Sequence, residues 1–122
     1  MRNRNLGFAA CLAIVGLTVA CGGGGGSEGG DTLAQGEKMY KQTCALCHGP
    51  SGQGMDRLGK ELIGNEFVAL NSTSTLVDFL IEGRPATHPD NERGVDMPPR
   101  GGNPNLSDED LAAIVGFIKT LK

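Results

Sequence analysis

The stretch Cys44-Ala45-Leu46-Cys47-His48 decides the fold of this 122-residue chain. Two thiols three residues apart, followed at once by a histidine, form the pattern through which a c-type haem is attached. On a helical turn, residues three apart lie on one face, so both sulfurs can reach the vinyl groups along one edge of a porphyrin. The histidine then places its imidazole under the ring. The motif therefore predicts one covalently bound haem c, with His48 as an iron ligand.

Two other sites use the same spacing of cysteines. A zinc site needs a second ligand pair, but Cys11 and Cys21 lie in or at the end of an N-terminal targeting segment, and pairing His48 with His88 would put Cys47 and His48 side by side. A thioredoxin-like redox pair expects alternating strands and helices, and the chain shows no such alternation. Haem is the interpretation that the sequence favours.

Residues 1–20 are predicted to be a signal peptide. Arg2 and Arg4 precede an apolar run, Leu6–Ala20, of about 15 residues. A membrane-spanning helix needs about 20 residues, whereas a charged start followed by a short apolar run is typical of a secretory signal. A short N-terminal anchor helix is the alternative.

The end of this segment, Leu17-Thr18-Val19-Ala20-Cys21, resembles the lipobox of bacterial lipoproteins, although its leucine lies four residues before the cysteine rather than three. The resemblance implies cleavage before Cys21 and acylation of its thiol. An ordinary signal cut nearby is the alternative, but it would leave an unpaired thiol, which secreted proteins rarely keep. Two or more acyl chains give stable anchoring. We therefore expect an exported, membrane-anchored lipoprotein that faces the periplasm or the cell exterior.

Residues 21–30 are predicted to be the lipidated cysteine and a Gly-rich linker, Gly22–Gly30, that behaves as flexible coil spanning roughly 15–18 Å. Loss of residues 1–20 removes Arg2 and Arg4 from 11 basic residues, which leaves 9 against 14 acidic ones and a formal net charge of −5. Such a charge disfavours nucleic acid as a partner. It favours a redox partner with a basic docking patch.

A folded domain is predicted for residues 31–122, and no strand pattern in it is convincing. Asp31 or Thr32 can cap a helix that leads into the haem motif. Gly36 lies four residues before Tyr40, on the same helical face. Because glycine inside a helix costs about 1 kcal/mol relative to alanine, Gly36 is expected to permit a close crossing with another helix.

Two further helices follow. Ser72 or Ser74 can cap a helix that stops at Gly83. Ser107 and Asp110 form a capping-box pattern at the start of the last helix. The apolar residues of the last helix recur at helical spacing, which predicts one buried stripe: Leu111, Ile114, Val115, Ile118 and Leu121. The domain is therefore predicted to be all-α.

The domain resembles a class I (monohaem) c-type cytochrome over about Asp31–Lys122, in particular the small cytochromes and cytochrome domains attached to bacterial respiratory complexes. In that family the first helix ends in C-x-x-C-H and crosses the C-terminal helix almost at right angles. Gly36 and Tyr40 match the family's contacts on the first helix, and Ile114 and Phe117 match those on the last. The resemblance implies three to four helices wrapped around one haem.

The family usually carries Gly-Pro-x-Leu twelve residues after the haem histidine, and the proline carbonyl accepts the free ring N–H of that histidine. This sequence has Gly59-Lys60-Glu61-Leu62 instead. A lysine carbonyl can accept the same hydrogen bond, because only the backbone takes part. The missing proline affects how rigidly this hydrogen bond orients the histidine ring.

The resemblance also implies a methionine as sixth iron ligand, in a proline-bearing loop before the last helix. Residues 84–105 are rich in proline and glycine and are predicted to be irregular, and Met97 lies there, directly before two prolines. Met39 is expected to pack in the core, and Met55 follows the haem histidine too closely. His88 in a polar loop remains an alternative ligand, as does an open site.

A thioether opposite an imidazole raises the iron potential, and a six-coordinate iron suits outer-sphere electron transfer rather than catalysis. Arg84 and Arg100 are possible contacts of the haem propionates, with surface solvation as the alternative. The leading prediction is a one-electron carrier, not an enzyme, tethered to a bacterial membrane through Cys21 and passing electrons between membrane-bound redox proteins of respiratory complexes. A fixed cytochrome subunit of a quinol-oxidising complex or terminal oxidase is the first alternative. A haem enzyme or ligand sensor with an open site is the second.

Overall fold

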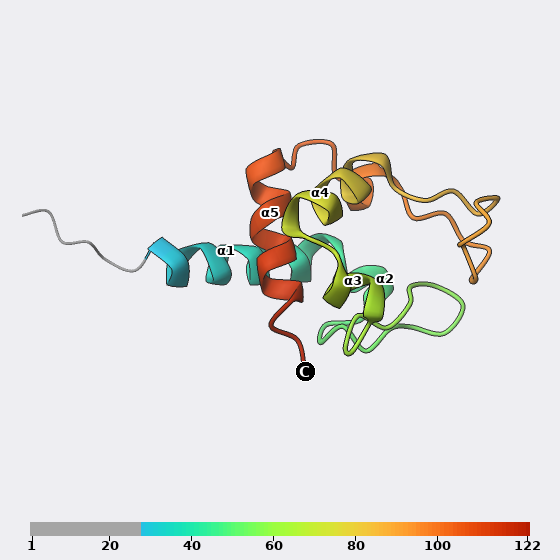
Figure 1. Ribbon diagram of the computed structural model, residues 1–122, viewed down its shortest axis with the longest axis horizontal. Helices are drawn as coiled ribbons and strands as arrows, with labels where there is room; N and C mark the ends of the chain where they lie inside the picture. Colours follow the sequence, from blue (N-terminus) through green and yellow to red (C-terminus); the bar gives the residue numbers. More distant parts are fainter. Residues whose placement is uncertain (1–27) are drawn as a thin grey trace, which may run out of the picture.

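The computed structural model describes residues 28–122, which form helices joined by long loops (Figure 1). No sheet occurs in this range, and its one strand-like pairing is an isolated antiparallel bridge between Arg84 and Met97. The predicted all-α class is therefore confirmed. In chain order the elements are α1 (Glu28–Thr43), α2 (Ala45–His48), α3 (Glu66–Leu70), α4 (Thr73–Glu82), the 3₁₀ helix η1 (Pro99–Gly102) and α5 (Asp108–Ile118).

The first and last helices cross at Gly36, and Figure 1 shows α5 passing over α1. A Cβ atom on Gly36 would collide with the backbone carbonyl of Ala113 in α5. One turn further along α1, Tyr40 is fully buried, and its ring centroid lies 5.3 Å from that of Phe117. The close crossing expected from Gly36 is confirmed, and it needs a residue without a side chain.

Hydrogen bonds at the helix ends explain where α4 and α5 begin. The Ser72 hydroxyl accepts the Thr75 N–H at 3.1 Å, and α4 stops at Gly83, whose φ is 71°. At the start of α5 the Ser107 hydroxyl accepts the Asp110 N–H at 3.1 Å, and the Asp110 carboxylate accepts the Ser107 N–H at 2.9 Å. Both predicted starts are correct, because local capping chemistry determines them.

Two boundaries differ from the prediction. Helix α1 begins at Glu28, inside the segment predicted to be linker, rather than at a cap on Asp31 or Thr32. Gly29 and Gly30 are tolerated there because the N–H groups of a first turn need no partner within the helix. Helix α5 ends at Ile118, and Leu121 packs against the core from the turn beyond it.

The signal peptide predicted for residues 1–20 and the acylation predicted at Cys21 lie outside the residues that the structure describes. Within residues 28–122, no helix has the length and apolar composition needed to cross a bilayer.

The buried core is small, and one side of it faces a cavity. The buried side chains come from α1, α4, α5 and the segment before α5. The Lys119 ammonium group donates to the backbone carbonyl of Asn71 at 2.7 Å and so ties the end of α5 to the segment between α3 and α4. The buried cluster comprises Tyr40, Leu76, Leu80, Leu106, Leu111, Ile114, Val115 and Ile118.

Candidate functional site

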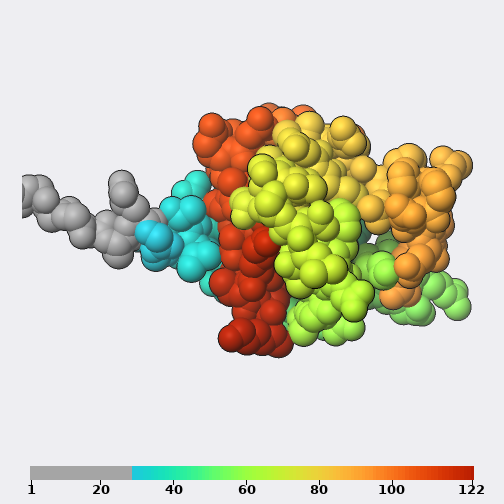
Figure 2. All heavy atoms as spheres, in the orientation of Figure 1, coloured from blue at the N-terminus to red at the C-terminus, as the bar shows by residue number. Residues whose placement is uncertain are grey.

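One cavity brings together the residues that the sequence singled out. Cys44, Cys47, His48 and Met97 all line it, although Met97 follows His48 by 49 residues. Figure 2 shows the loop that carries Met97, in orange, projecting on the side of the molecule away from the start of α1. Most of the remaining wall is apolar and includes Leu58, Leu62, Phe67, Val68, Leu76, Phe79, Leu80, Leu111, Val115 and Ile118.

The two cysteines of the motif lie in different surroundings. Cys44, at the junction of α1 and α2, is partly buried, whereas Cys47 is exposed. Burial, and to a lesser degree the neighbouring Cys47, raise the pKa of Cys44 to about 11. The side chain is therefore a neutral thiol at physiological pH. A redox-active C-x-x-C pair lowers the pKa of its reactive thiol, whereas the pKa of Cys44 is shifted in the opposite direction.

His48 is oriented by the backbone of a distant segment. Its Nδ1 lies 2.7 Å from the carbonyl oxygen of Lys60. Since a carbonyl only accepts hydrogen bonds, Nδ1 carries the proton, and Nε2 is the nitrogen left free to bind a metal. A Cβ atom on Gly59 would meet the Cys47 carbonyl and would lie 2.9 Å from His48 Nδ1. Gly59 thus lets the Lys60 carbonyl come this close.

Met97 is held by paired backbone bonds. Its N–H donates to the Arg84 carbonyl, and its carbonyl accepts the Arg84 N–H, both at 2.8 Å. Pro99, two residues later, begins η1 at a position where a missing N–H costs nothing. Residues 84–105 are largely irregular, as predicted; the exceptions are the isolated bridge between Arg84 and Met97 and the short η1, in which Arg100 and Gly101 depart from helical φ/ψ.

The other candidate ligands lie elsewhere. Met39 packs against the core, as expected. Met55 is 41% exposed and does not line the cavity. His88 also lies outside the cavity wall, and its Nδ1 accepts the backbone N–H of Asp90 at 3.1 Å. These positions favour Met97 over the alternatives.

Both arginines proposed to contact propionates line the cavity, and both already have partners. The Arg84 guanidinium carbon lies 4.7 Å from the ring centroid of Phe79 and 5.4 Å from that of Phe67. Arg100 donates to the Asp108 carboxylate at 2.7 Å and also to the Leu106 carbonyl. Sequence reasoning missed these contacts, and the propionate role of both residues stays a prediction.

The residues of the cavity fit a haem c group. One thiol from the junction of α1 and α2 and one from α2 line the cavity with an imidazole whose Nδ1 is already bonded, a thioether lines the same space, and the wall is largely apolar. In the described part of the chain, no group of three or more His, Cys, Asp or Glu side chains is placed to hold a metal ion.

Comparisons with known proteins agree with this chemistry. The family described as cytochrome C oxidase, cbb3-type, subunit III matches residues 31–118. A cytochrome c subunit of alcohol dehydrogenase (quinone) from Gluconacetobacter polyoxogenes is 31% identical over 96 residues, which cover 77% of this chain and 20% of that protein. Its counterpart from Gluconobacter oxydans (strain 621H) is 32% identical over 95 residues, which cover 76% of this chain and 19% of that protein.

The chain thus spans about a fifth of the length of these curated relatives. No solved structure matches it. Membership of the family implies covalent haem c and the role of an electron carrier. With the match over residues 31–118 and the C-x-x-C-H motif in the wall of the cavity, the chain belongs to the cytochrome c family of cbb3-type oxidase subunit III.

Proposed function

We propose that this chain is a monohaem, membrane-tethered carrier that passes single electrons between respiratory complexes. The observation that carries the proposal is that His48 and Met97, from opposite ends of the domain sequence, line one apolar cavity with Cys44 and Cys47 at its wall.

In this proposal each residue has a distinct role. Cys44 and Cys47 would hold the haem through thioether links, and His48, through Nε2, and Met97, through its sulfur, would bind the iron. Bound haem supplies a reversible one-electron couple. The thioether and the apolar wall favour the reduced state and so raise the reduction potential. With both His48 and Met97 bound to the iron, no position would be open to a small substrate, which would suit electron transfer rather than catalysis.

The tether is proposed from the sequence. Acylated Cys21 would hold the domain at a bilayer, and the short glycine-rich segment after it would let the domain turn toward membrane-bound donors and acceptors. A tether raises the effective concentration of the domain at such partners. The localisation that follows is an exported protein anchored to a membrane and facing the periplasm or cell exterior.

Two measurements on the haem-loaded full chain test the proposal. A pyridine haemochrome assay should give one haem c per chain, and the ferric protein should show a methionine–iron charge-transfer band. Two haems, or none, would reject the monohaem assignment. A ferric spectrum without that band, together with tight binding of cyanide or carbon monoxide, would point to an open-site enzyme or sensor.

The relatives support a second candidate, a fixed subunit. They are cytochrome c subunits of a quinone-linked alcohol dehydrogenase. The two candidates share their chemistry but differ in how long the partner stays bound. Affinity purification from detergent-solubilised membranes of the native cell separates them: a stoichiometric complex indicates a subunit, and a chain that elutes alone but is reduced by those membranes indicates a carrier.

A further inference from the structure

One side chain ties together the loop that carries Met97. The side-chain nitrogen of Asn91 donates to three backbone carbonyls, and its side-chain oxygen accepts two backbone N–H groups. The amide has two hydrogens, so the longest of the three donated bonds is shared. The acceptors are Val95 (2.8 Å), Pro85 (3.0 Å) and Arg84 (3.4 Å), and the donors are Gly94 (3.0 Å) and Arg93 (3.2 Å).

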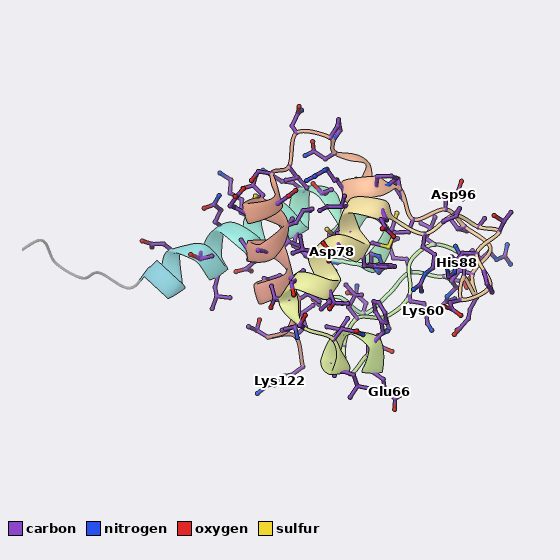
Figure 3. The ribbon with its side chains drawn as sticks, turned by 45° about the horizontal axis from the view of Figure 1, so that its top comes forward. Lys60, Glu66, Asp78, His88, Asp96 and Lys122 are labelled. Atoms are coloured by element: carbon purple, nitrogen blue, oxygen red, sulfur yellow. The ribbon has the colours of Figure 1, made fainter. Side chains whose placement is uncertain are left out.

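These bonds join the two limbs of the loop. Arg84 and Pro85 lie on the limb that leaves α4, and Val95 lies on the limb that returns to Met97. Two other links join the same limbs: the backbone pair of Arg84 and Met97, and a bond in which the Asp96 carboxylate accepts the Ala86 N–H at 2.6 Å. Figure 3 places Asp96 and His88 on this loop, away from α5.

Hydrogen bonds and the ion pair between Lys60 and Glu92 at 2.8 Å, rather than apolar packing, hold the tip of the loop. No residue between 85 and 96 is buried, and Val95 is 37% exposed. Loops with few buried apolar contacts open locally at low cost in free energy. Asn91 itself is partly buried and, like Met97, lines the cavity.

We propose that Asn91 is a positioning residue for Met97: it keeps the loop over residues 84–97 closed and so keeps the thioether at the cavity. The proposal rests on the assignment of Met97 as an iron ligand. Without the amide, the limbs remain joined near their base only, the loop opens more often, and the sulfur leaves its place more often. An external ligand then competes more effectively for the iron.

Two variants and one matched control test this in the haem-loaded full chain. Asn91→Ala removes all five bonds. Asn91→Asp keeps the acceptor toward Arg93 and Gly94 but loses the donated bonds that join the limbs. Asn71→Ala is the control, because Asn71 also donates to a backbone carbonyl, that of Phe67 at 2.7 Å, but lies outside the loop.

The first readout is binding of imidazole to the ferric protein, followed as loss of the methionine–iron band. We expect the apparent dissociation constant to fall about tenfold in both Asn91 variants, since each lost bond favours the open loop. The second readout is hydrogen exchange of the Met97 amide, which should become roughly tenfold faster. Exchange in α1 and α5 should not change, which separates positioning from a general loss of stability. Asn71→Ala should match the wild type in both readouts.

The outcomes distinguish the two proposals. A wild-type protein without a methionine–iron band overturns sulfur ligation and the role of Asn91 together. A wild-type band with unchanged imidazole affinity and unchanged Met97 exchange in both variants overturns the role of Asn91 alone. Equal acceleration of exchange in the loop and in α5 also overturns it, because Asn91 would then act on the whole fold.

Discussion

The carbonyl oxygen of Lys60 lies 2.7 Å from Nδ1 of His48. The ammonium group of the same lysine lies 2.8 Å from the Glu92 carboxylate, in the loop that carries Met97. One residue therefore contacts the segments on both sides of the cavity, and Figure 3 shows Lys60 beside this loop. The bond to His48 uses the backbone and survives substitution of the lysine side chain, whereas the ion pair does not.

The ion pair should make stability depend on acid and salt. Lys60 lowers the pKa of Glu92 below its usual value, first by its hydrogen bond and then by its charge. A carboxylate with a lowered folded pKa stabilises the fold above its unfolded pKa, and this contribution is lost as pH falls through the folded pKa. Glu92→Gln should lower the Tm slightly at neutral pH and low salt, and the difference from wild type should vanish in acid or in high salt.

The control for this measurement is Asp78→Asn on α4, a carboxylate that forms no ion pair among the described residues. The Tm difference between Asp78→Asn and the wild type should not show the same dependence on pH and salt. A Glu92→Gln difference that persists in acid would contradict the ion pair as its cause.

Gly59→Ala should weaken the hydrogen bond between His48 Nδ1 and the Lys60 carbonyl. The new methyl group would meet the Cys47 carbonyl and the His48 ring, so the Lys60 carbonyl must move away. Overpacking of this kind costs about 1–3 kcal/mol of unfolding free energy. We expect this loss in denaturant titration of the haem-loaded protein, together with a changed reduction potential because the His48 bond is weakened. Lys60→Ala retains the backbone acceptor and should keep the wild-type potential; a normal potential in both variants would count against the role of this bond.

Gly36→Ala should be among the most damaging single-methyl changes in the chain. The added carbon would collide with the Ala113 backbone carbonyl, which cannot swing aside as a side chain can. The unfolding free energy should fall by about 2–3 kcal/mol. In Gly116→Ala, by contrast, the new carbon meets only the Leu33 side chain at 3.6 Å, an ordinary contact. That variant should be neutral or gain up to about 1 kcal/mol from helix propensity, and equal losses in both would refute the close crossing.

Met97→Ala should abolish the methionine–iron band and lower the reduction potential, because the thioether no longer favours ferrous iron. Potentiometric titration followed by absorbance gives both quantities. Met55→Ala is the matched control, since that side chain is exposed and lies outside the cavity wall. A band that survives in Met97→Ala but is lost in Met55→Ala would reverse the assignment.

Cys21→Ser should release the chain from the membrane. Without the thiol no acyl chain can be attached there, and stable anchoring needs more than one. Fractionation of cells should move the haem-loaded protein from the membrane to the soluble fraction. Cys11→Ser changes a cysteine within the predicted signal and should leave the distribution unchanged. Retention of Cys21→Ser in the membrane would refute this anchor.

Local chemistry made much of the fold predictable. The capping bonds of Ser72 and Ser107 involve residues within three positions, so the sequence shows both partners together. The role of Gly36 follows from the cost of glycine in a helix and from the family resemblance. The motif at residues 44–48 identifies the cavity, because its spacing reflects covalent chemistry.

Contacts between loops were not predictable in the same way. Neither periodicity nor spacing links Lys60 to Glu92, or places the Arg84 guanidinium over Phe79. Asn91 looks like any polar loop residue in sequence, and only the folded loop shows that its amide bonds to both limbs. The start of α1 was missed because its first turn is rich in glycine, and the tertiary fold tolerated a composition that local propensity disfavours.

The crossing of α1 and α5 also orders events in time. Gln35 donates to the Asp110 carboxylate across 75 residues of sequence, so the ribosome has made nearly the whole domain before these helices can meet. Until α1 and α5 pack together, the thiols of Cys44 and Cys47 are accessible to the enzyme that attaches haem. Covalent loading can therefore precede tertiary closure, and an exported chain truncated before α5 is the natural substrate on which to look for it.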